Sequence, residues 1–287
     1  MPELPEVETV RLGLQPALAG ARLKRVEARR PDLRFPLPDG FVQKLTGARI
    51  DRLDRRGKYL LAPLDRGLTL VMHLGMTGRF EIEGDETSIR PGSFVRSASV
   101  DQKHAHIVFH TDTGARVTFF DPRRFGFMDL VETASLDKHA WFAGMGPEPL
   151  GDEFNADYLA AAFSGRRQGA KTLLLDQKIV AGLGNIYVCE ILHRAKVSPV
   201  KDAGLIGRGK CAEIIKSARS VLTEALAAGG STLRDFAGAD GALGYFQHSF
   251  EAYGREGQPC TNKRCRGTVE RLVQGGRSTF FCRECQT

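Results

Sequence analysis

The sequence predicts an α+β protein in which an N-terminal helix and a β-sandwich precede a helical region, with a cysteine-rich β-hairpin at the end. Three observations support this order. Apolar residues recur at helical spacing in residues 3–18, short β-rich runs fill residues 21–130, and helical patterns return after the Pro/Gly-rich stretch GMGPEPLG at 144–151. A chain of 287 residues has room for about two domains with a real core.

Residues 3–18 form the first expected element. Their apolar side chains are three or four positions apart, as on one face of an amphipathic helix: Leu4, Val7, Val10, Leu14 and Leu18. Pro2 and Pro5 suit the entry to a helix, where a missing N–H costs nothing.

The region from about Ala21 to Leu130 has a different pattern. Runs such as LTLVMHL, HIVFH and ARVTFF are separated by breaks rich in Gly, Pro and Asp. This alternation is typical of a β-sandwich or barrel.

Helical patterns dominate the next part of the chain. We expect helices near 155–163, 172–180, 185–193 and 208–228, the last with an apolar stripe and a Gly229-Gly230 stop. Beyond Cys260, TVERLV and STFFC flank Gln274-Gly275-Gly276-Arg277, which is a β-hairpin signal. The expected domains are 1–135, 150–235 and 250–287.

The amino-acid composition indicates the kind of partner and argues against two classes of protein. Lys and Arg number 41 against 34 Asp and Glu, and the resulting charge of +7 favours an anionic partner, with nucleic acid ahead of a membrane surface. No apolar run reaches the roughly 18–20 residues of a membrane span, and the acidic start MPELPEVETV is unlike a secretory signal. We therefore expect neither a membrane protein nor a secreted one.

Four of the six cysteines are clustered in the last 28 residues: Cys260, Cys265, Cys282 and Cys285. The pattern Cys-x4-Cys-x16-Cys-x2-Cys puts one pair at each end of the hairpin, where four thiolates can surround one Zn²⁺. Such a site has no open position, so the zinc is expected to be structural. Four ordinary cysteines or two disulfides are the alternatives, but the clustering and spacing favour metal in a reducing cytoplasm.

The N-terminus offers a chemical possibility of its own. Removal of Met1 would leave Pro2 with a free secondary amine, and at pH 7 an α-amine is roughly 10% neutral against about 0.04% for lysine. Such an amine forms an iminium with an aldehyde-level carbon, and Glu3 and Glu6 could move protons beside it. Taken alone, the stretch fits ordinary helix capping better.

Eight motifs in one order then resemble the bacterial formamidopyrimidine-DNA glycosylase family of oxidised-purine repair enzymes. They are MPELPEVETV, RRGKYL at 55–60, HLGMTGR at 73–79, KHAH at 103–106, DPRRFG at 121–126, GPEPL at 146–150, LLDQKIVAGLGNIYVCE at 174–190 and GGRSTFFCRECQ at 275–286. The related endonuclease VIII branch, which prefers oxidised pyrimidines, typically has Gly where this chain has Leu4. The resemblance implies base excision repair by a glycosylase that is also an AP lyase.

The resemblance assigns catalytic roles to four residues. It implies that Pro2 is the nucleophile at C1′, that Glu3 is the acid/base, that Lys58 assists base loss and β-elimination, and that Arg277 contacts the lesion phosphate and serves δ-elimination. Without the match at Pro2, Lys58 would be read as a solvated strand lysine and Arg277 as one more phosphate contact.

DNA contacts follow from the same resemblance. Because a base inside a duplex is out of reach, the damaged nucleotide must be flipped out and its place filled by side chains. Met76, Arg123 and Phe125 match the residues that fill the void, although Met76 and Phe125 alone would suggest core positions. The residues that match phosphate contacts are His104, Arg166, Lys171 and Asn185.

The segment before Asn185 reads as helix, Gly-rich turn, helix, which the family calls a helix–two-turn–helix. A nucleotide-binding G-x-G loop is the rival interpretation, but it lacks the preceding strand and the third glycine. The resemblance also implies damaged double-stranded DNA as partner, one structural Zn²⁺, a monomer and a cytoplasmic location.

Two features depart from the family or vary within it. The first cysteine pair is separated by four residues where two are more common, which is still within the range of zinc sites. The loop over the flipped base is assigned to residues 234–250, whose glycines predict a mobile lid. The alternatives that remain open are a non-catalytic zinc-finger DNA-binding protein and the pyrimidine-specific relative.

Overall fold

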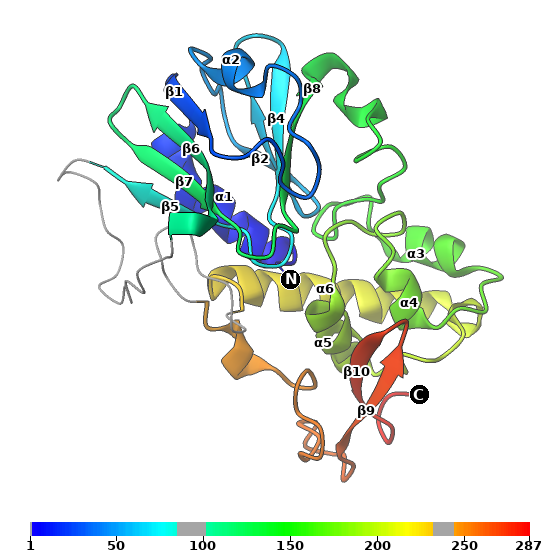
Figure 1. Cartoon of the computed structure of the whole chain (residues 1–287). Helices are drawn as coiled ribbons and strands as arrows, with labels where there is room; N and C mark the ends of the chain where they lie inside the picture. The colour runs from blue at the N-terminus through cyan, green and yellow to red at the C-terminus, as the bar shows by residue number, and fades with distance from the viewer. Residues whose placement is uncertain (1, 85–101, 232–243) are drawn as a thin grey trace. The chain divides into compact units, whose positions relative to one another are not determined.

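The computed structural model describes residues 2–84, 102–231 and 244–287. The chain divides into two compact units, one formed by Met1–Ala143 with Ala228–Tyr245 and the other by Gly144–Ala227 with Phe246–Thr287 (Figure 1). Each unit is described by itself.

The first unit is built from one long helix and two sheets. Its elements are α1 (Leu4–Leu18), β1 (Leu23–Ala28), α2 (Phe41–Leu45), β2 (Asp54–Arg56), β3 (Tyr59–Pro63), β4 (Leu68–His73), β5 (Arg79–Glu83), η1 (Gln102–His104), β6 (Ala105–Thr111), β7 (Arg116–Phe120), β8 (Phe127–Glu132) and η2 (Thr133–Lys138). The strand orders are β1-β6-β7-β5 and β2-β3-β4-β8, and every pairing is antiparallel.

A single core joins α1 to both sheets. Val7, Val10 and Leu14 of the helix pack with buried residues of either sheet, among them Leu60, Met72, Phe109 and Phe119. These helix positions are the apolar stripe that the sequence predicts, and the β-rich texture before residue 130 folds as the expected sandwich. The hydrophobic pattern was sufficient here because each sheet buries one face against the same helix.

The second unit is helical and ends in a β-hairpin. Its elements are α3 (Ala156–Phe163), α4 (Ala170–Leu174), α5 (Asn185–Ala195), η3 (Ala203–Leu205), α6 (Arg208–Ala227), η4 (Phe246–Ser249), β9 (Val269–Gln274) and β10 (Arg277–Cys282). Strands β9 and β10 are antiparallel and turn at Gly275-Gly276, where φ is 53° and 74°. Such left-handed angles at both central residues favour glycine, as the hairpin prediction required.

One expected helix is shorter than predicted. The pattern at 172–180 suggests a helix, but α4 ends at Leu174 and turns connect it to α5. The side chains of Asp176 and Gln177 are responsible, because they compete for backbone groups: Asp176 accepts from the N–H of Lys178, and Gln177 accepts from the N–H of Gly182. The segment is thus a helix, two turns and a helix.

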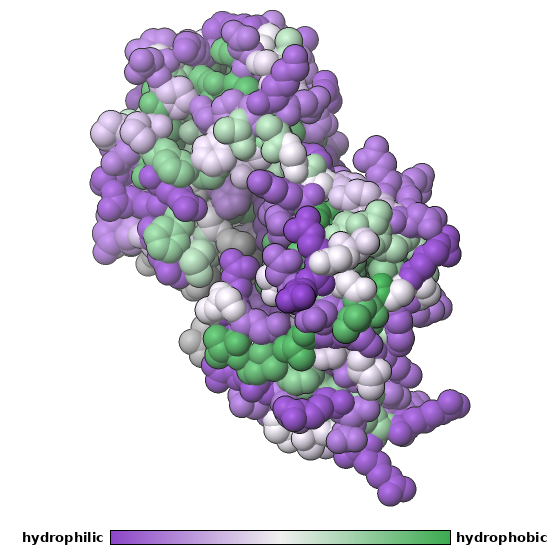
Figure 2. Space-filling view, turned by 90° about the vertical axis from the view of Figure 1, so that its right-hand side faces the viewer, coloured by the Kyte–Doolittle hydropathy of each residue, from purple (hydrophilic) through white to green (hydrophobic). Residues whose placement is uncertain are grey.

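Apolar residues outside the core lie among polar ones. The face in Figure 2 is covered mainly by hydrophilic side chains, with smaller apolar patches between them. Within the described ranges, no helix has the length and apolar character that a bilayer crossing requires.

Candidate active site and nucleic-acid interface

The N-terminal turn of α1 holds two buried carboxylates. Pro2 is buried, Glu3 is the N-cap residue of α1 and is 2% exposed, and Glu6 is 2% exposed one turn later. Oε2 of Glu6 accepts from the backbone N–H of Glu3 at 2.9 Å, while Oε1 accepts from the N–H (2.8 Å) and hydroxyl (3.0 Å) of Ser231. This bonding fixes the backbone next to Pro2 and gives Glu6 a positioning role beside the proton transfer that the sequence suggested for it.

Lys58 lies in the tight turn between β2 and β3. Gly57 has a φ of 54°, and Lys58 is only 7% exposed, so it is not the solvated strand lysine of the alternative interpretation. Arg55 anchors this hairpin to α1, because its Nε is 3.1 Å from Oε2 of Glu8. The Lys58 turn is therefore fixed to the same helix that begins after Glu3.

His73 is a neighbour of Lys58 that the sequence reasoning did not single out. It ends β4 opposite Tyr59, and its ring stacks on Phe127 with centroids 5.2 Å apart. Burial lowers the pKa of His73 to about 4, and the positive charges of Lys58 and Arg34 add to the effect. The ring is neutral at pH 7, and Nδ1 accepts from the N–H of Gly75 at 3.1 Å, so the proton sits on Nε2. The sequence did not indicate His73, because only the strand register that pairs His73 with Tyr59 places it near Lys58.

The three residues expected to fill the DNA void lie on two loops that touch. Met76 is 36% exposed and Phe125 40% exposed, and the guanidinium of Arg123 lies 4.7 Å from the centre of the Phe125 ring. A Cβ on Gly75 would come within 2.3 Å of the backbone at Phe125, so the loops are in direct backbone contact. Neither Met76 nor Phe125 is a core residue in this structure.

Asp121 connects these loops. It is fully buried, and its carboxylate accepts from Thr77 Oγ1 at 2.5 Å and from the N–H of Gly126 at 2.7 Å. Thr77 in turn accepts from the N–H of Arg123 at 3.2 Å. The match of DPRRFG to a family motif gave no sign that its aspartate is the buried link to the Met76 loop.

The four cysteines of the hairpin converge. Their sulfur atoms all lie within 4.8 Å of one another, with 3.6 Å between Cys260 and Cys285 and 3.6 Å between Cys265 and Cys282. A tetrahedral zinc with bonds near 2.3 Å would place its sulfurs about 3.8 Å apart. Burial raises the pKa of Cys260 and Cys285, and a bound cation would favour their thiolate forms. The residues fit zinc, and no disulfide joins them.

The tip of the hairpin carries Arg277, which is exposed at the start of β10. The carbonyl of the next residue, Ser278, accepts from Lys171 Nζ (3.1 Å) and from Asn185 Nδ2 (2.9 Å). Helices α4 and α5 thus anchor the strand directly beside Arg277.

Lys171, which the resemblance matches to a phosphate contact, is enclosed in this arrangement. Lys171 is 0% exposed, and its ammonium donates to Thr279 Oγ1 at 2.6 Å as well as to Ser278. Its role in the structure is to hold the hairpin, and a motif match cannot distinguish a buried lysine from an exposed one.

The other expected DNA contacts occupy separate places. Arg166 is exposed after α3, and His104 is half-buried at the end of η1. Asn185 is half-buried and begins α5, directly after the N-cap residue Gly184. Of the loop assigned to 234–250, residues 234–243 lie outside the described residues.

Comparisons with known proteins agree along the whole chain. Three family models match: the formamidopyrimidine-DNA glycosylase N-terminal domain over residues 1–128, the formamidopyrimidine-DNA glycosylase H2TH domain over 145–237, and the zinc finger found in FPG and IleRS over 257–287. A formamidopyrimidine-DNA glycosylase of Phenylobacterium zucineum is 67% identical over 286 residues, which is 100% of both chains.

Two solved structures of Lactococcus lactis proteins are also similar. An Fpg mutant in complex with Fapy-dG containing DNA is 30% identical with a TM-score of 0.85, and the match covers 100% of both chains. Fpg in complex with abasic site containing DNA is 30% identical with a TM-score of 0.85 over 99% of both chains.

The β-sandwich, the helix–two-turn–helix and the four-cysteine hairpin together define the H2TH class of DNA glycosylases. Within that class, the chain belongs to the formamidopyrimidine-DNA glycosylase family.

Proposed function

We propose that this chain is a base excision repair enzyme that removes oxidised purines, 8-oxoguanine and formamidopyrimidines, from duplex DNA and then cleaves the strand as an AP lyase. The observation that carries the proposal is the N-terminal turn, where Pro2 lies beside the buried carboxylates Glu3 and Glu6. The Lactococcus lactis relatives bound to Fapy-dG DNA and to abasic-site DNA support the substrate class.

The reaction begins at the amine of Pro2. Its lone pair attacks C1′ of the damaged nucleotide, the bond from C1′ to the base breaks, and the base leaves with a proton. Glu3 protonates the sugar ring oxygen as the ring opens to a cationic iminium. Lys58 assists base loss and removal of the C2′ proton.

Strand cleavage follows from the iminium. Loss of the C2′ proton converts the iminium into an enamine, whose electron pair then expels the 3′ phosphate as the C3′–O bond breaks. Loss of the C4′ proton drives a second elimination, in which the C5′–O bond breaks and the 5′ phosphate leaves. Arg277, exposed at the hairpin tip, contacts the lesion phosphate and supports this second step. The product is a gap of one nucleotide.

DNA is held by two further groups of residues. Met76, Arg123 and Phe125, exposed on loops joined by Asp121, fill the space left by the flipped nucleotide, with Arg123 toward the partner base. His104, Arg166 and Asn185 bind phosphate, with Asn185, the first residue of α5, at the positive end of the helix dipole. Binding therefore weakens steeply with salt.

One zinc ion per chain, held by the four cysteines, stabilises the hairpin that carries Arg277. We assign catalysis to the domain of residues 1–135, phosphate binding to the domain of residues 150–235, and the zinc finger to residues 250–287. The chain acts in the cytoplasm, in keeping with its free cysteines. It acts as a monomer, which light scattering of the purified protein tests.

Borohydride trapping tests the chemistry. The chain with Pro2 as its first residue should be trapped on a duplex that contains 8-oxoguanine, with the adduct on the N-terminal peptide. A variant extended before Pro2 should bind the same duplex but neither trap nor cut it, and a C-terminal tag serves as control. Cleavage by the extended variant would show that another amine is the nucleophile, and Lys58 would be the first candidate. A chain with Pro2 first that binds the duplex but forms no adduct would be a non-catalytic zinc-finger protein.

Two measurements test the other assignments. Duplexes with 8-oxoguanine opposite cytosine should be cut faster than duplexes with oxidised pyrimidines, and the reverse order would place the chain with the pyrimidine-specific relatives. Cys282→Ser should lower the zinc content and abolish DNA binding while the first unit stays folded by circular dichroism. Normal binding by that variant contradicts the role of the zinc hairpin.

A further inference from the structure

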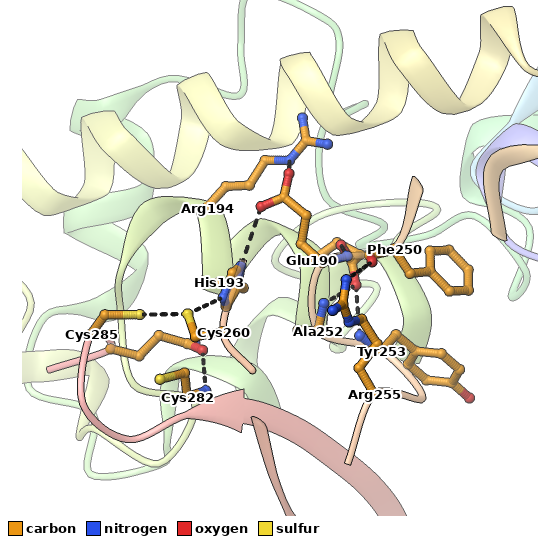
Figure 3. Close-up of polar contacts among 12 residues, drawn as sticks. Glu190, His193, Arg194, Phe250, Ala252, Tyr253, Arg255, Cys260, Cys282 and Cys285 are labelled. Carbon is orange, nitrogen blue, oxygen red and sulfur yellow. Dashed lines mark hydrogen bonds and ion pairs between the residues drawn. The ribbon is translucent and has the colours of Figure 1, made fainter. Parts of the chain in front are cut away.

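His193 lies between a cysteine of the zinc site and a carboxylate. It belongs to the last turns of α5 and is 3% exposed. Its Nε2 is 3.5 Å from Sγ of Cys260, and its Nδ1 is 3.4 Å from Oε2 of Glu251 (Figure 3). Figure 3 shows the ring of His193 directed at the Cys260 sulfur.

The proton on Nε2 follows from the chemistry of the sulfur. A cysteine that binds zinc is a thiolate and has no hydrogen to donate, so a hydrogen bond between the two atoms requires Nε2–H as the donor. The distance is within the limit for a hydrogen bond to sulfur. His193 therefore approaches the site as a donor to a ligand.

His193 is not itself a fifth candidate ligand. Among the described residues, the cluster of donor atoms that lie within 4.8 Å of one another consists of the four cysteines. We propose that His193 is an outer-shell residue of the zinc site, whose Nε2–H bond to the Cys260 sulfur holds that ligand in place and slows loss of the metal. This inference rests on the zinc site proposed above.

The surroundings of His193 fix the ring. Glu251 also lies 3.1 Å from Nε of Arg194, and Arg194 makes two hydrogen bonds to Glu224 at 2.6 and 2.7 Å. The backbone N–H groups of residues 251–253 donate to the buried carboxylate of Glu190 at 2.7–3.0 Å. The carboxylate that faces the ring is thus bound to the same helix as the ring.

Helix α5 consequently contacts the zinc-finger segment, residues 257–287, at both ends of the helix. Asn185, its first residue, donates to the Ser278 carbonyl beside Arg277, and His193 faces a zinc ligand two turns later. Outer-shell hydrogen bonds orient metal ligands and commonly change metal affinity by about 10–100-fold. The metal site and the phosphate-binding helix are therefore expected to stabilise each other.

Zinc release from two variants of the full chain tests the hydrogen bond. His193→Phe keeps a flat ring but has no donor, whereas the side-chain amide of His193→Gln can donate from near the position of Nε2. With the chelator 4-(2-pyridylazo)resorcinol in excess, we expect release about tenfold faster for His193→Phe and within about threefold of the unsubstituted chain for His193→Gln. His110→Phe, a histidine of the first unit that also pairs with a glutamate, is the control.

Zinc content measured before each release experiment separates this inference from the zinc proposal. A chain without zinc contradicts the zinc site itself, while a chain with zinc and equal release rates for His193→Phe and the unsubstituted protein overturns the role of His193. Equally fast release from both variants also overturns it, because it shows that ring packing and not the donor matters.

A spectroscopic measurement needs no variant. In the unsubstituted chain loaded with cadmium-113 in place of zinc, the Nε2–H proton of His193 should show a scalar correlation to the metal through the sulfur. A resolved Nε2–H resonance without that correlation contradicts the hydrogen bond.

Discussion

The backbone N–H of Glu3 donates to the carboxylate of Glu6 across 2.9 Å, inside a part of the first unit from which solvent is excluded. The same carboxylate receives the N–H and hydroxyl of Ser231, which is more than two hundred residues later in the chain. The proposed nucleophile is therefore attached to a turn whose geometry depends on a distant segment.

Glu6→Gln should weaken this arrangement. The amide replaces one acceptor oxygen with a donor, which then faces an N–H group, so we expect a loss of about 2 kcal/mol in the free energy of unfolding. Borohydride trapping should slow at the same time, because the turn no longer fixes Pro2. The exposed Glu132→Gln serves as the control, and unchanged trapping by Glu6→Gln would contradict the positioning role.

Asp121→Ala should separate the two loops that carry Met76 and Phe125. The substitution leaves the Thr77 hydroxyl and the Gly126 N–H without their buried acceptor and should cost about 3 kcal/mol of stability. Affinity for an abasic-site duplex, measured by fluorescence anisotropy, should fall by about tenfold or more, since small displacements of contact residues are costly. Asp112→Ala removes an exposed acceptor of the same unit and should bind normally.

The buried position of Lys171 predicts an unusual salt dependence for its variant. Lys171→Met should slow strand incision, because the strand beside Arg277 loses an anchor. The slope of log affinity against log salt should stay unchanged, since no phosphate contact is lost. Arg166→Met, which removes an exposed cation, should reduce that slope by about 1. A reduced slope for Lys171→Met would show that Lys171 contacts a phosphate directly.

His73 predicts a loss of stability in mild acid. Its pKa in the folded chain is about 4, below the ordinary value of 6.5, because burial and the charge of Lys58 disfavour the protonated ring. The unfolded chain therefore takes up the proton first as the pH falls from 6.5 towards 4, and stability decreases over that window. Between pH 7 and pH 5 the contribution is about 2 kcal/mol.

Urea unfolding at both pH values tests this expectation. His73→Gln cannot titrate but keeps an oxygen that can accept a hydrogen bond, so its stability should fall less between pH 7 and pH 5 than that of the unsubstituted chain. Parallel decreases in the two proteins would contradict the shifted pKa.

Periodicity and turn chemistry were enough to predict much of the fold. The stripe from Val7 to Leu14 has the repeat of a helix face, and Gly275-Gly276 has the freedom that a two-residue hairpin needs. Both signals are local, because they depend on residues a few positions apart. The prediction of a helix at 172–180 was wrong beyond Leu174, because side-chain bonds of Asp176 and Gln177 to the backbone outweighed the apolar pattern.

The amino-acid sequence by itself determined the kinds of groups available: a proline amine with adjacent carboxylates, four metal-binding thiols, and the family to which their order belongs. Only the tertiary structure decided which of those groups are exposed and what they contact. It enclosed Lys171, linked two loops through Asp121, and set His193 against Cys260. Burial and hydrogen bonding join residues that are distant in the chain, and for that reason no local pattern contains them.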